Sequence, residues 1–221
     1  MKFNKTIITT ILIIVFSFVL GIISNDPIIG SIVLSTGILS IWFQVKGKAY
    51  NYIFACIYDI CNAYISYKNN LYGLFLFSLL LHLPLNIYGF INWNKNKDDD
   101  NNVSFRKFNK TKSILVILSA IISSVILGYI LRINPNQRLE FLDSTADILN
   151  IYGIVLLSKR LREGWYVSLF DNIVDLSIWI LNFLDSRPNS LMMIYVSLIY
   201  LIIGIYGIYK YKSAKEITSL Y

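Results

Sequence analysis

Apolar residues dominate eight stretches of the chain, and short polar or charged segments separate them. A helix that crosses a membrane needs about 17–25 predominantly apolar residues. The stretches that meet this length cover residues 5–24, 28–45, 50–66, 71–92, 113–131, 142–158, 165–184 and 190–211. The pattern therefore predicts an all-α integral membrane protein with eight transmembrane helices.

Two of these stretches end in similar sequences, which indicates an internal repeat. Asn86-Ile87-Tyr88-Gly89 closes the fourth stretch, and Gly204-Ile205-Tyr206-Gly207 closes the last. An odd number of helices per repeat reverses the chain, so one connecting helix lets both three-helix repeats start from the same side. Such 3+1+3 parallel repeats place a substrate site between the halves. The predicted units are an extra N-terminal transmembrane helix (1–27), the first three-helix repeat (28–92), a cytoplasmic linker with the connecting helix (93–141), and the second three-helix repeat with a cytoplasmic tail (142–221).

Composition and charge agree with a membrane protein. Hydrophobic residues make up 56% of the chain and charged residues 15%, with a mean hydropathy of +0.58. If the N-terminus is cytoplasmic, 16 of the 20 Lys and Arg residues fall on the cytoplasmic side, as the positive-inside rule requires. We therefore expect a bacterial plasma-membrane protein with both termini in the cytoplasm. Basic loops beside anionic lipid explain the net charge of +7 without a nucleic-acid partner.

The other simple signals exclude several classes of function. The first apolar stretch could be a signal peptide, but its length and the absence of a small-residue cleavage site before Pro27 favour a retained helix. Cys56 and Cys61 lie in one predicted span, which favours ordinary packing over a disulfide or a metal site. No phosphate-binding loop and no hydrolase or metalloprotease motif is present, so we predict no catalytic residues, no metal and no cofactor.

A polar and aromatic stripe on the seventh span is the strongest candidate for a binding site. Its members follow one another at spacings of three and four, which places them on one helical face: Trp165, Ser168, Asn172, Asp175 and Trp179. A carboxylate facing lipid is costly, so the stripe should face the bundle interior. Indole rings can stack on a flat ligand, and an ionised Asp175 would favour a cationic one. The alternative is a stripe that only joins helices, with the Trp residues as interfacial anchors.

Matching polar positions occur in the first half. Moving the stripe back by 117 positions lands on Lys48, Asn51, Ala55, Tyr58 and Asn62. Asn86 adds a candidate on the fourth span, beside His82 and a Pro84 that should bend the helix. The predicted substrate-binding residues of this half are Asn51, Tyr58, Asn62 and Asn86. Asp59 and Asp171 could contact substrate or be paired within the bundle, and weaker candidates are Gln44, Asp147, Asn150 and His82.

Two segments resemble a known family. Asn86-Ile87-Tyr88-Gly89-Phe90-Ile91-Asn92-Trp93 and Arg160-Leu161-Arg162-Glu163-Gly164-Trp165 are similar to motifs of the PnuC family of bacterial vitamin-precursor transporters, and the resemblance covers roughly residues 30–211. It implies the helix plan of the SWEET sugar carriers and facilitated diffusion of nicotinamide riboside or a related vitamin. It also implies trapping of the substrate by a cytoplasmic kinase, and a homotrimer.

One position departs from the family pattern. The nicotinamide riboside members carry Trp-Xaa-Xaa-Trp-Xaa-Xaa-Xaa-Asn, and here Trp165 and Asn172 match while Ser168 replaces the second Trp. Thiamine, riboflavin or a (deoxy)nucleoside are therefore alternative substrates. A membrane protein that binds its ligand without moving it is another reading. A membrane enzyme would need a catalytic pair such as Asp59 with Asp175.

Overall fold

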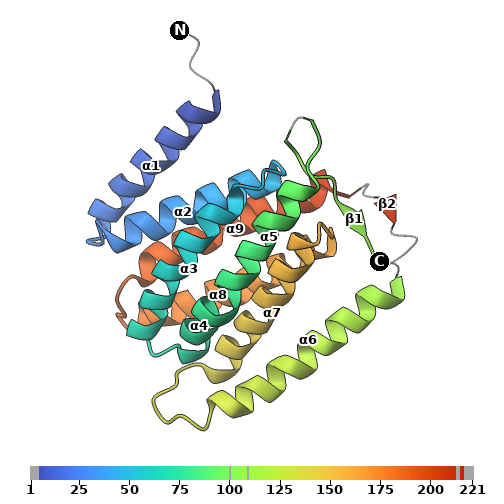
Figure 1. Cartoon of the computed structure of the whole chain (residues 1–221). Coiled ribbons are helices and arrows are strands. Elements are labelled where there is room, and N and C mark those ends of the chain that lie inside the picture. Colours follow the sequence, from blue (N-terminus) through green and yellow to red (C-terminus); the bar gives the residue numbers. More distant parts are fainter. Residues whose placement is uncertain (1–4, 100, 109, 213–214, 217–221) are drawn as a thin grey trace.

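The computed structural model describes residues 5–99, 101–108, 110–212 and 215–216, and these are almost entirely helical (Figure 1). A π-helical segment, η1 (Ser78–His82), joins α4 to α5 without a break, so the described helices form eight rods. The helices are α1 (Lys5–Ile23), α2 (Ile29–Val45), α3 (Asn51–Lys68), α4 (Tyr72–Phe77), α5 (Leu83–Lys95), α6 (Lys110–Leu131), α7 (Glu140–Ser158), α8 (Glu163–Leu184) and α9 (Ser190–Lys210). The ends of the eight predicted helices agree with the rods to within three residues. Two short strands, β1 (Arg106–Lys107) and β2 (Lys215–Glu216), pair in parallel.

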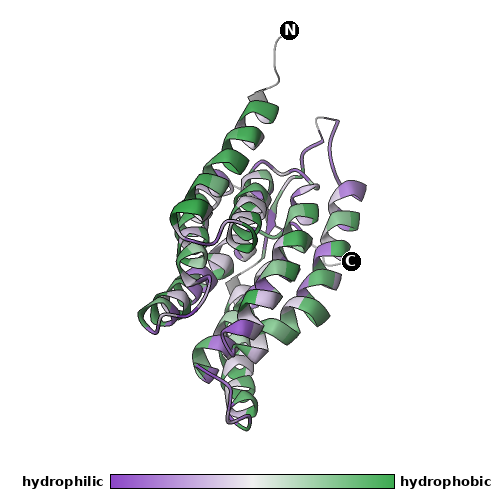
Figure 2. Cartoon of the chain, turned by 90° about the vertical axis from the view of Figure 1, so that its left-hand side faces the viewer, coloured by the Kyte–Doolittle hydropathy of each residue, from purple (hydrophilic) through white to green (hydrophobic). Residues whose placement is uncertain are grey.

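The rods have the apolar surface of a multi-pass membrane protein. Six of them are long and apolar enough to cross a bilayer, and α2 is a shorter apolar helix. Large hydrophobic side chains are exposed along α1 and α6, and green hydrophobic ribbon covers most of the helical length in Figure 2. The polar α3 is not among these candidate spans in the described part of the chain. The eight-span plan therefore stays a prediction.

Six rods close into a ring. Each contacts the next in the order α2, α3, α5, α7, α8, α9 and back to α2. The two remaining helices flank this ring, α1 against α2 and α6 against α7, at opposite edges of the view in Figure 1. The contacts of α1, α2, α3 and α5 thus repeat those of α6, α7, α8 and α9. In these contacts α1 and α6 take equivalent places.

The interruption in the fourth rod has a local cause. Pro84 lacks a backbone N–H and clashes with the carbonyl one turn before it, so the turn that precedes it cannot keep regular α-helical hydrogen bonds. The structure places the π-helical turn Ser78–His82 directly before Pro84, at the start of α5. A wider turn relieves the clash while the rod continues.

The loops of the ring gather at two ends. At the first, which we name the basic end, lie segments 46–50, 96–99, 101–108 and 159–162. Three bonds tie this end together: from the Val103 amide to the Gly47 carbonyl, from the Arg106 amide to the Arg160 carbonyl, and from the Tyr211 hydroxyl to the Val45 carbonyl, at 3.0, 2.8 and 3.0 Å. Burial raises the pKa of Tyr211, which keeps its phenol a neutral donor. Residues 1–4, which we expect on the same side, lie outside the described residues.

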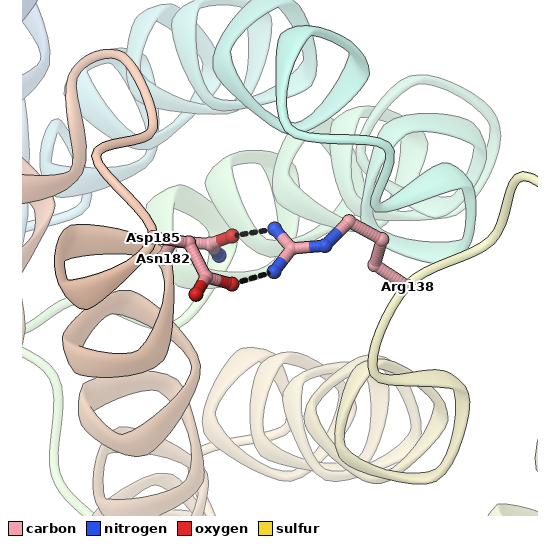
Figure 3. A network of polar contacts seen from close by, with 3 residues as sticks. All are labelled: Arg138, Asn182 and Asp185. Carbon is pink, nitrogen blue, oxygen red and sulfur yellow. Dashed lines mark hydrogen bonds and ion pairs between the residues drawn. The ribbon is translucent and has the colours of Figure 1, made fainter.

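The opposite end holds segments 24–28, 69–71, 132–139 and 185–189. Bonds join these segments as well, from the Asn69 amide group to the Pro188 carbonyl at 3.2 Å and from the Arg138 amide to the Asn70 carbonyl at 3.1 Å. The Arg138 guanidinium also donates to Asn182 at 2.6 Å and pairs with Asp185 (Figure 3). Alternate loops therefore lie at the same end, in agreement with the pattern of charge along the sequence.

The described part of the linker between the halves is anchored to the helices of the ring by two buried side chains. Val103 and Phe105 are 4% and 6% exposed. The Phe105 ring lies against those of Trp93, Trp165 and Tyr211, with centroids 5.7, 6.2 and 4.2 Å away. Two apolar side chains without helical periodicity therefore suffice to anchor this loop to the helices.

Candidate functional site

A cavity at the centre of the ring is lined by residues from all six ring helices. It lies in the half of the ring nearer the basic end, since its lining comes from the last turns of α2 and α7 and the first half of α3 and α8. Its volume is about 80 Å³. Ligand pockets usually measure about 300–1,000 Å³. A ligand of ordinary size therefore requires side chains or helices to move apart.

Six of the nine predicted site residues line this cavity together. They come from three helices, with Asn51 and Tyr58 on α3, Asn86 on α5, and Trp165, Ser168 and Asn172 on α8. Trp165, Asn172, Asn51 and Asn86 are almost completely buried. The lining combines aromatic, polar and aliphatic side chains, which suits a flat ring carrying hydrogen-bonding groups. That these side chains contact a ligand stays a prediction.

The other three predicted site residues lie outside the lining of the cavity. Trp179 is 1% exposed and packs in an apolar cluster with Val33, Ile178 and Met193 nearer the opposite end. The Asn62 amide group donates to the Ser78 hydroxyl at 3.5 Å. Asp175 stands one helical turn beyond Asp171. The stripe from Trp165 to Trp179 extends for about 20 Å along its helix, so only its first half reaches the level of the cavity.

The structure adds lining residues that the sequence indicated weakly or not at all. The residues that the sequence indicated weakly are Gln44, Asn150, Asp59 and Asp171. The sequence analysis missed Ser40 and Tyr200. Ser40 lies between Thr36 and Gln44 at spacings of four, and Tyr200 lies three residues after Ser197, so helical spacing could have indicated both faces. Gly204 also lines the cavity, and it takes the place in the duplicated Tyr-Gly motif that Asn86 takes in the first half. The first half thus contributes an amide where the second contributes a glycine.

Two carboxyl groups in the lining are held by amides from neighbouring helices. The Asn86 amide group donates to Asp59 Oδ2 at 2.7 Å, and that of Asn150 donates to Asp171 Oδ2 at 3.1 Å. Both aspartates also line the cavity. The two readings of these residues, pairing within the bundle and contact with a ligand, are therefore compatible.

The duplicated glycines explain how the two halves position their aromatic rings. A Cβ atom on Gly89 would lie 2.5 Å from the Tyr52 ring, and one on Gly207 would lie 2.5 Å from the Trp165 ring. Each glycine therefore makes room for the first aromatic ring of the middle helix in its own half. One turn after each glycine, a second ring packs on the first, Trp93 on Tyr52 and Tyr211 on Trp165, at centroid distances of 5.1 and 6.0 Å.

These glycine contacts also fix the correspondence between the halves. They pair Trp165 with Tyr52, whereas the sequence offset of 117 paired it with Lys48. Counting from the paired rings, the residues three, six and seven positions later line the cavity in both halves. In α3 these are Ala55, Tyr58 and Asp59, and in α8 they are Ser168, Asp171 and Asn172.

Comparisons with known proteins place the chain among membrane transporters. The family described as nicotinamide mononucleotide transporter matches residues 27–213. A nicotinamide riboside transporter PnuC from Neisseria mucosa is 28% identical over 195 residues, covering 86% of this chain and 73% of the relative. One from Haemophilus influenzae is 22% identical over 187 residues, covering 83% and 79%.

A solved structure shares the fold. The crystal structure of the vitamin B3 transporter PnuC superposes with a TM-score of 0.81 at 24% identity, covering 95% of this chain and 92% of the other. The match extends over the flanking helices as well as the ring, because it leaves only 5% of the chain uncovered.

Proposed function

The chain belongs to the nicotinamide mononucleotide transporter family, and we propose that it carries nicotinamide riboside or a closely related vitamin precursor across a bacterial plasma membrane. The central cavity is the observation that supports this most strongly. Both halves of the ring line it, and Trp165 and Asn172 lie in it at the positions that match the pattern of the nicotinamide riboside members. No enzymatic step is needed for this function.

In the proposed topology all eight rods cross the membrane as one extra N-terminal helix plus 3+1+3 parallel repeats. The basic end is cytoplasmic, as are both termini. Clustering of the Lys- and Arg-rich loops at one end of the ring supports this orientation. The main contact of α6 is with α7 and that of α1 is with α2, so each flanking helix packs mainly against its own half, which supports two halves that move as separate bodies.

Transport then proceeds by facilitated diffusion. Substrate reaches the cavity from the opposite end, where bonds such as that from Arg138 to Asn70 must open. It is released at the basic end after the aromatic contacts of Phe105 separate. A cytoplasmic kinase traps the product by adding a phosphate, which keeps the gradient inward. The homotrimer implied by the family resemblance would bury part of the exposed apolar surface.

Within the cavity the aromatic and polar groups take different roles. Trp165 stacks on the flat ring of the substrate, because indole offers the largest apolar face in the lining. Asn172, Asn86 and Asn51 hydrogen-bond ribose hydroxyls or the carboxamide. Ser168 removes a second stacking surface, so thiamine, riboflavin and deoxynucleosides belong in the substrate test.

Uptake in cells decides the substrate. Labelled nicotinamide riboside, thiamine, riboflavin and thymidine are offered to a host that lacks its own carriers and contains the matching kinases. We expect nicotinamide riboside to accumulate in cells expressing this chain, and Trp165→Ala to abolish the accumulation. No uptake of any of the four compounds above the empty-vector level contradicts the proposal.

Proteoliposomes separate a carrier from a protein that only binds. Purified protein is reconstituted with unlabelled substrate inside, and labelled substrate is added outside. A facilitator exchanges the two without ATP or an ion gradient. Binding in detergent with no exchange in vesicles would identify a non-translocating membrane binding protein instead.

A further inference from the structure

We propose that Asp171, assisted by Asp59, makes this transporter selective for substrates with a positively charged aromatic ring. The inference rests on the proposed transport function and narrows its substrate class. Nicotinamide riboside carries a permanent positive charge on its pyridinium nitrogen, and thiamine carries one on its thiazolium ring. Riboflavin and thymidine are neutral.

The position of Asp171 provides the first argument. Its side chain lines the cavity and is only 4% exposed. Oδ2 accepts the amide bond from Asn150, while Oδ1 has no hydrogen-bond partner among the described residues. A buried carboxylate oxygen without a partner carries a large desolvation cost. A cationic group in the cavity would remove that cost.

A second carboxylate faces Asp171 across the ring. Asp59 lies on α3, which is opposite α8 in the order of contacts, and it is 5% exposed in the same lining. One of its oxygens is already bound by Asn86. A ligand between the two helices therefore has a carboxyl group on either side, and a positive charge there is attracted to both.

The lining of the cavity contains carboxyl groups but no Lys or Arg side chain from the described residues. Among the described residues, the ion pairs of Arg132, Arg138 and Arg162 all involve other carboxylates, and no Lys or Arg lines the cavity. Asp175 stands one turn further along α8, so a further carboxyl group lies near Asp171. Buried charges in a membrane protein are costly unless they are paired. The cavity therefore favours a cation.

The aromatic lining favours a cation that is also flat. Trp165, Tyr58 and Tyr200 line the cavity, and the two tyrosine rings lie 6.0 Å apart. Aromatic faces attract a positive charge that lies over them. Carboxylates and ring faces together select a heteroaromatic cation over an alkali ion, which has no ring to stack.

A pair of ligands with matched shapes tests the proposal. Nicotinamide riboside is positively charged, and its 1,4-dihydro form has nearly the same shape without the charge. Affinities of both are measured by calorimetry on the purified protein, for the wild type, Asp171→Asn, Asp59→Asn and Asp175→Asn. We expect the wild type to bind the cation at least about tenfold more tightly than the neutral form. Asp171→Asn should remove most of that preference, because the neutral amide no longer attracts the positive charge of the pyridinium ring.

The neutral ligand and the third variant serve as controls. Binding of the dihydro form should change less than about threefold in Asp171→Asn, which shows that the cavity has kept its shape. Asp175→Asn makes the same chemical change one turn outside the lining and should cost the cation much less. Asp59→Asn should fall between these two. Size-exclusion profiles and melting temperatures identify any variant that fails to fold.

Different results overturn different claims. Equal losses for both ligands in Asp171→Asn, or no loss for either, overturn the role of Asp171. If the wild type binds both ligands only with Na⁺ or at low pH, the carboxyl groups bind a coupling ion. That result also overturns the role of Asp171 in selecting the substrate. Binding of thiamine without nicotinamide riboside contradicts the proposed substrate but supports the selectivity for a cationic ring.

Discussion

The two halves of this molecule use the same scaffold to hold different chemistry. In each half a glycine of the duplicated motif makes room for an aromatic ring at the start of the middle helix. The ring is Tyr52 in the first half and Trp165 in the second, and only Trp165 lines the cavity. Symmetric backbone contacts have thus been combined with an asymmetric binding surface.

The difference shows which features serve the fold and which serve the ligand. A small nucleoside-like molecule has no two-fold symmetry, so a symmetric cavity could not match both its ring and its sugar. The contacts of Gly89 with Tyr52 and of Gly207 with Trp165 are repeated in the two halves, and so are the contacts between helices. The side chains that reach the cavity differ, with Asn86 set against Gly204 and Tyr58 against Asp171. Changing equivalent positions in the two halves should separate the two roles.

The largest difference in substrate affinity should come from removing the two equivalent aromatic rings, Trp165 and Tyr52. Trp165→Ala and Tyr52→Ala both remove a buried aromatic side chain, which costs about 3–5 kcal/mol of stability. We expect Trp165→Ala to weaken substrate binding about tenfold or more, because stacking and cation–π contacts are lost together. Tyr52→Ala should change the affinity by less than about threefold. Calorimetry and thermal unfolding of both variants measure the two effects, and equal losses of affinity would contradict the assigned asymmetry.

The next largest difference in affinity should come from substitutions of the two glycines that contact these rings, Gly89 and Gly207. A methyl group on Gly207 or Gly89 would lie 2.5 Å from the neighbouring ring, so each Ala variant should lose about 1–3 kcal/mol of stability through overpacking. Only Gly207→Ala displaces a ring that lines the cavity. We therefore expect it to weaken binding several-fold, while Gly89→Ala binds as the wild type does. Similar melting temperatures with different affinities would be the informative result.

Phe105 tests the place where the halves meet. Its ring contacts Trp93 of the first half and both Trp165 and Tyr211 of the second. It does not line the cavity, so Phe105→Ala should leave the affinity within about twofold. We expect faster exchange in proteoliposomes, because fewer aromatic contacts have to separate when the basic end opens. Val103→Ala, in the same cluster, loses less buried surface and serves as the control. Slower exchange in Phe105→Ala would show that the ring stabilises the open state instead.

The sequence predicted the helix ends more accurately than the residues of the cavity, and the difference has physical reasons. Helix ends follow from long apolar runs, so the eight rods were predicted to within three residues. Spacings of three and four identified the inward face of α8, but periodicity specifies a face and not a depth. Asp175 and Trp179 therefore lie on the predicted face and outside the cavity. Tyr200 lies on a mainly apolar helix whose Tyr and Ser residues do not form one stripe, and Phe105 lies in a loop, where helical periodicity does not apply.

The smallest effect should come from making the two halves alike at one position. Ser168 stands three residues after Trp165, as Ala55 stands three residues after Tyr52, and both line the cavity. Ser168→Ala removes one hydroxyl, and a single neutral hydrogen bond contributes about 0.5–1.5 kcal/mol. Affinity for nicotinamide riboside should therefore fall between about twofold and tenfold if the substrate uses this hydroxyl, and not at all if Ser168 only packs.

The second outcome is structurally reasonable, because a Cβ on Gly153 would lie 2.8 Å from the Ser168 Oγ, which shows how closely α7 and α8 approach here. Gly153→Ala serves as a positive control for this site, since pushing the two helices apart should weaken binding whichever role Ser168 has. A loss larger than that of Trp165→Ala would make Ser168, and not the indole, the main contact of the second half.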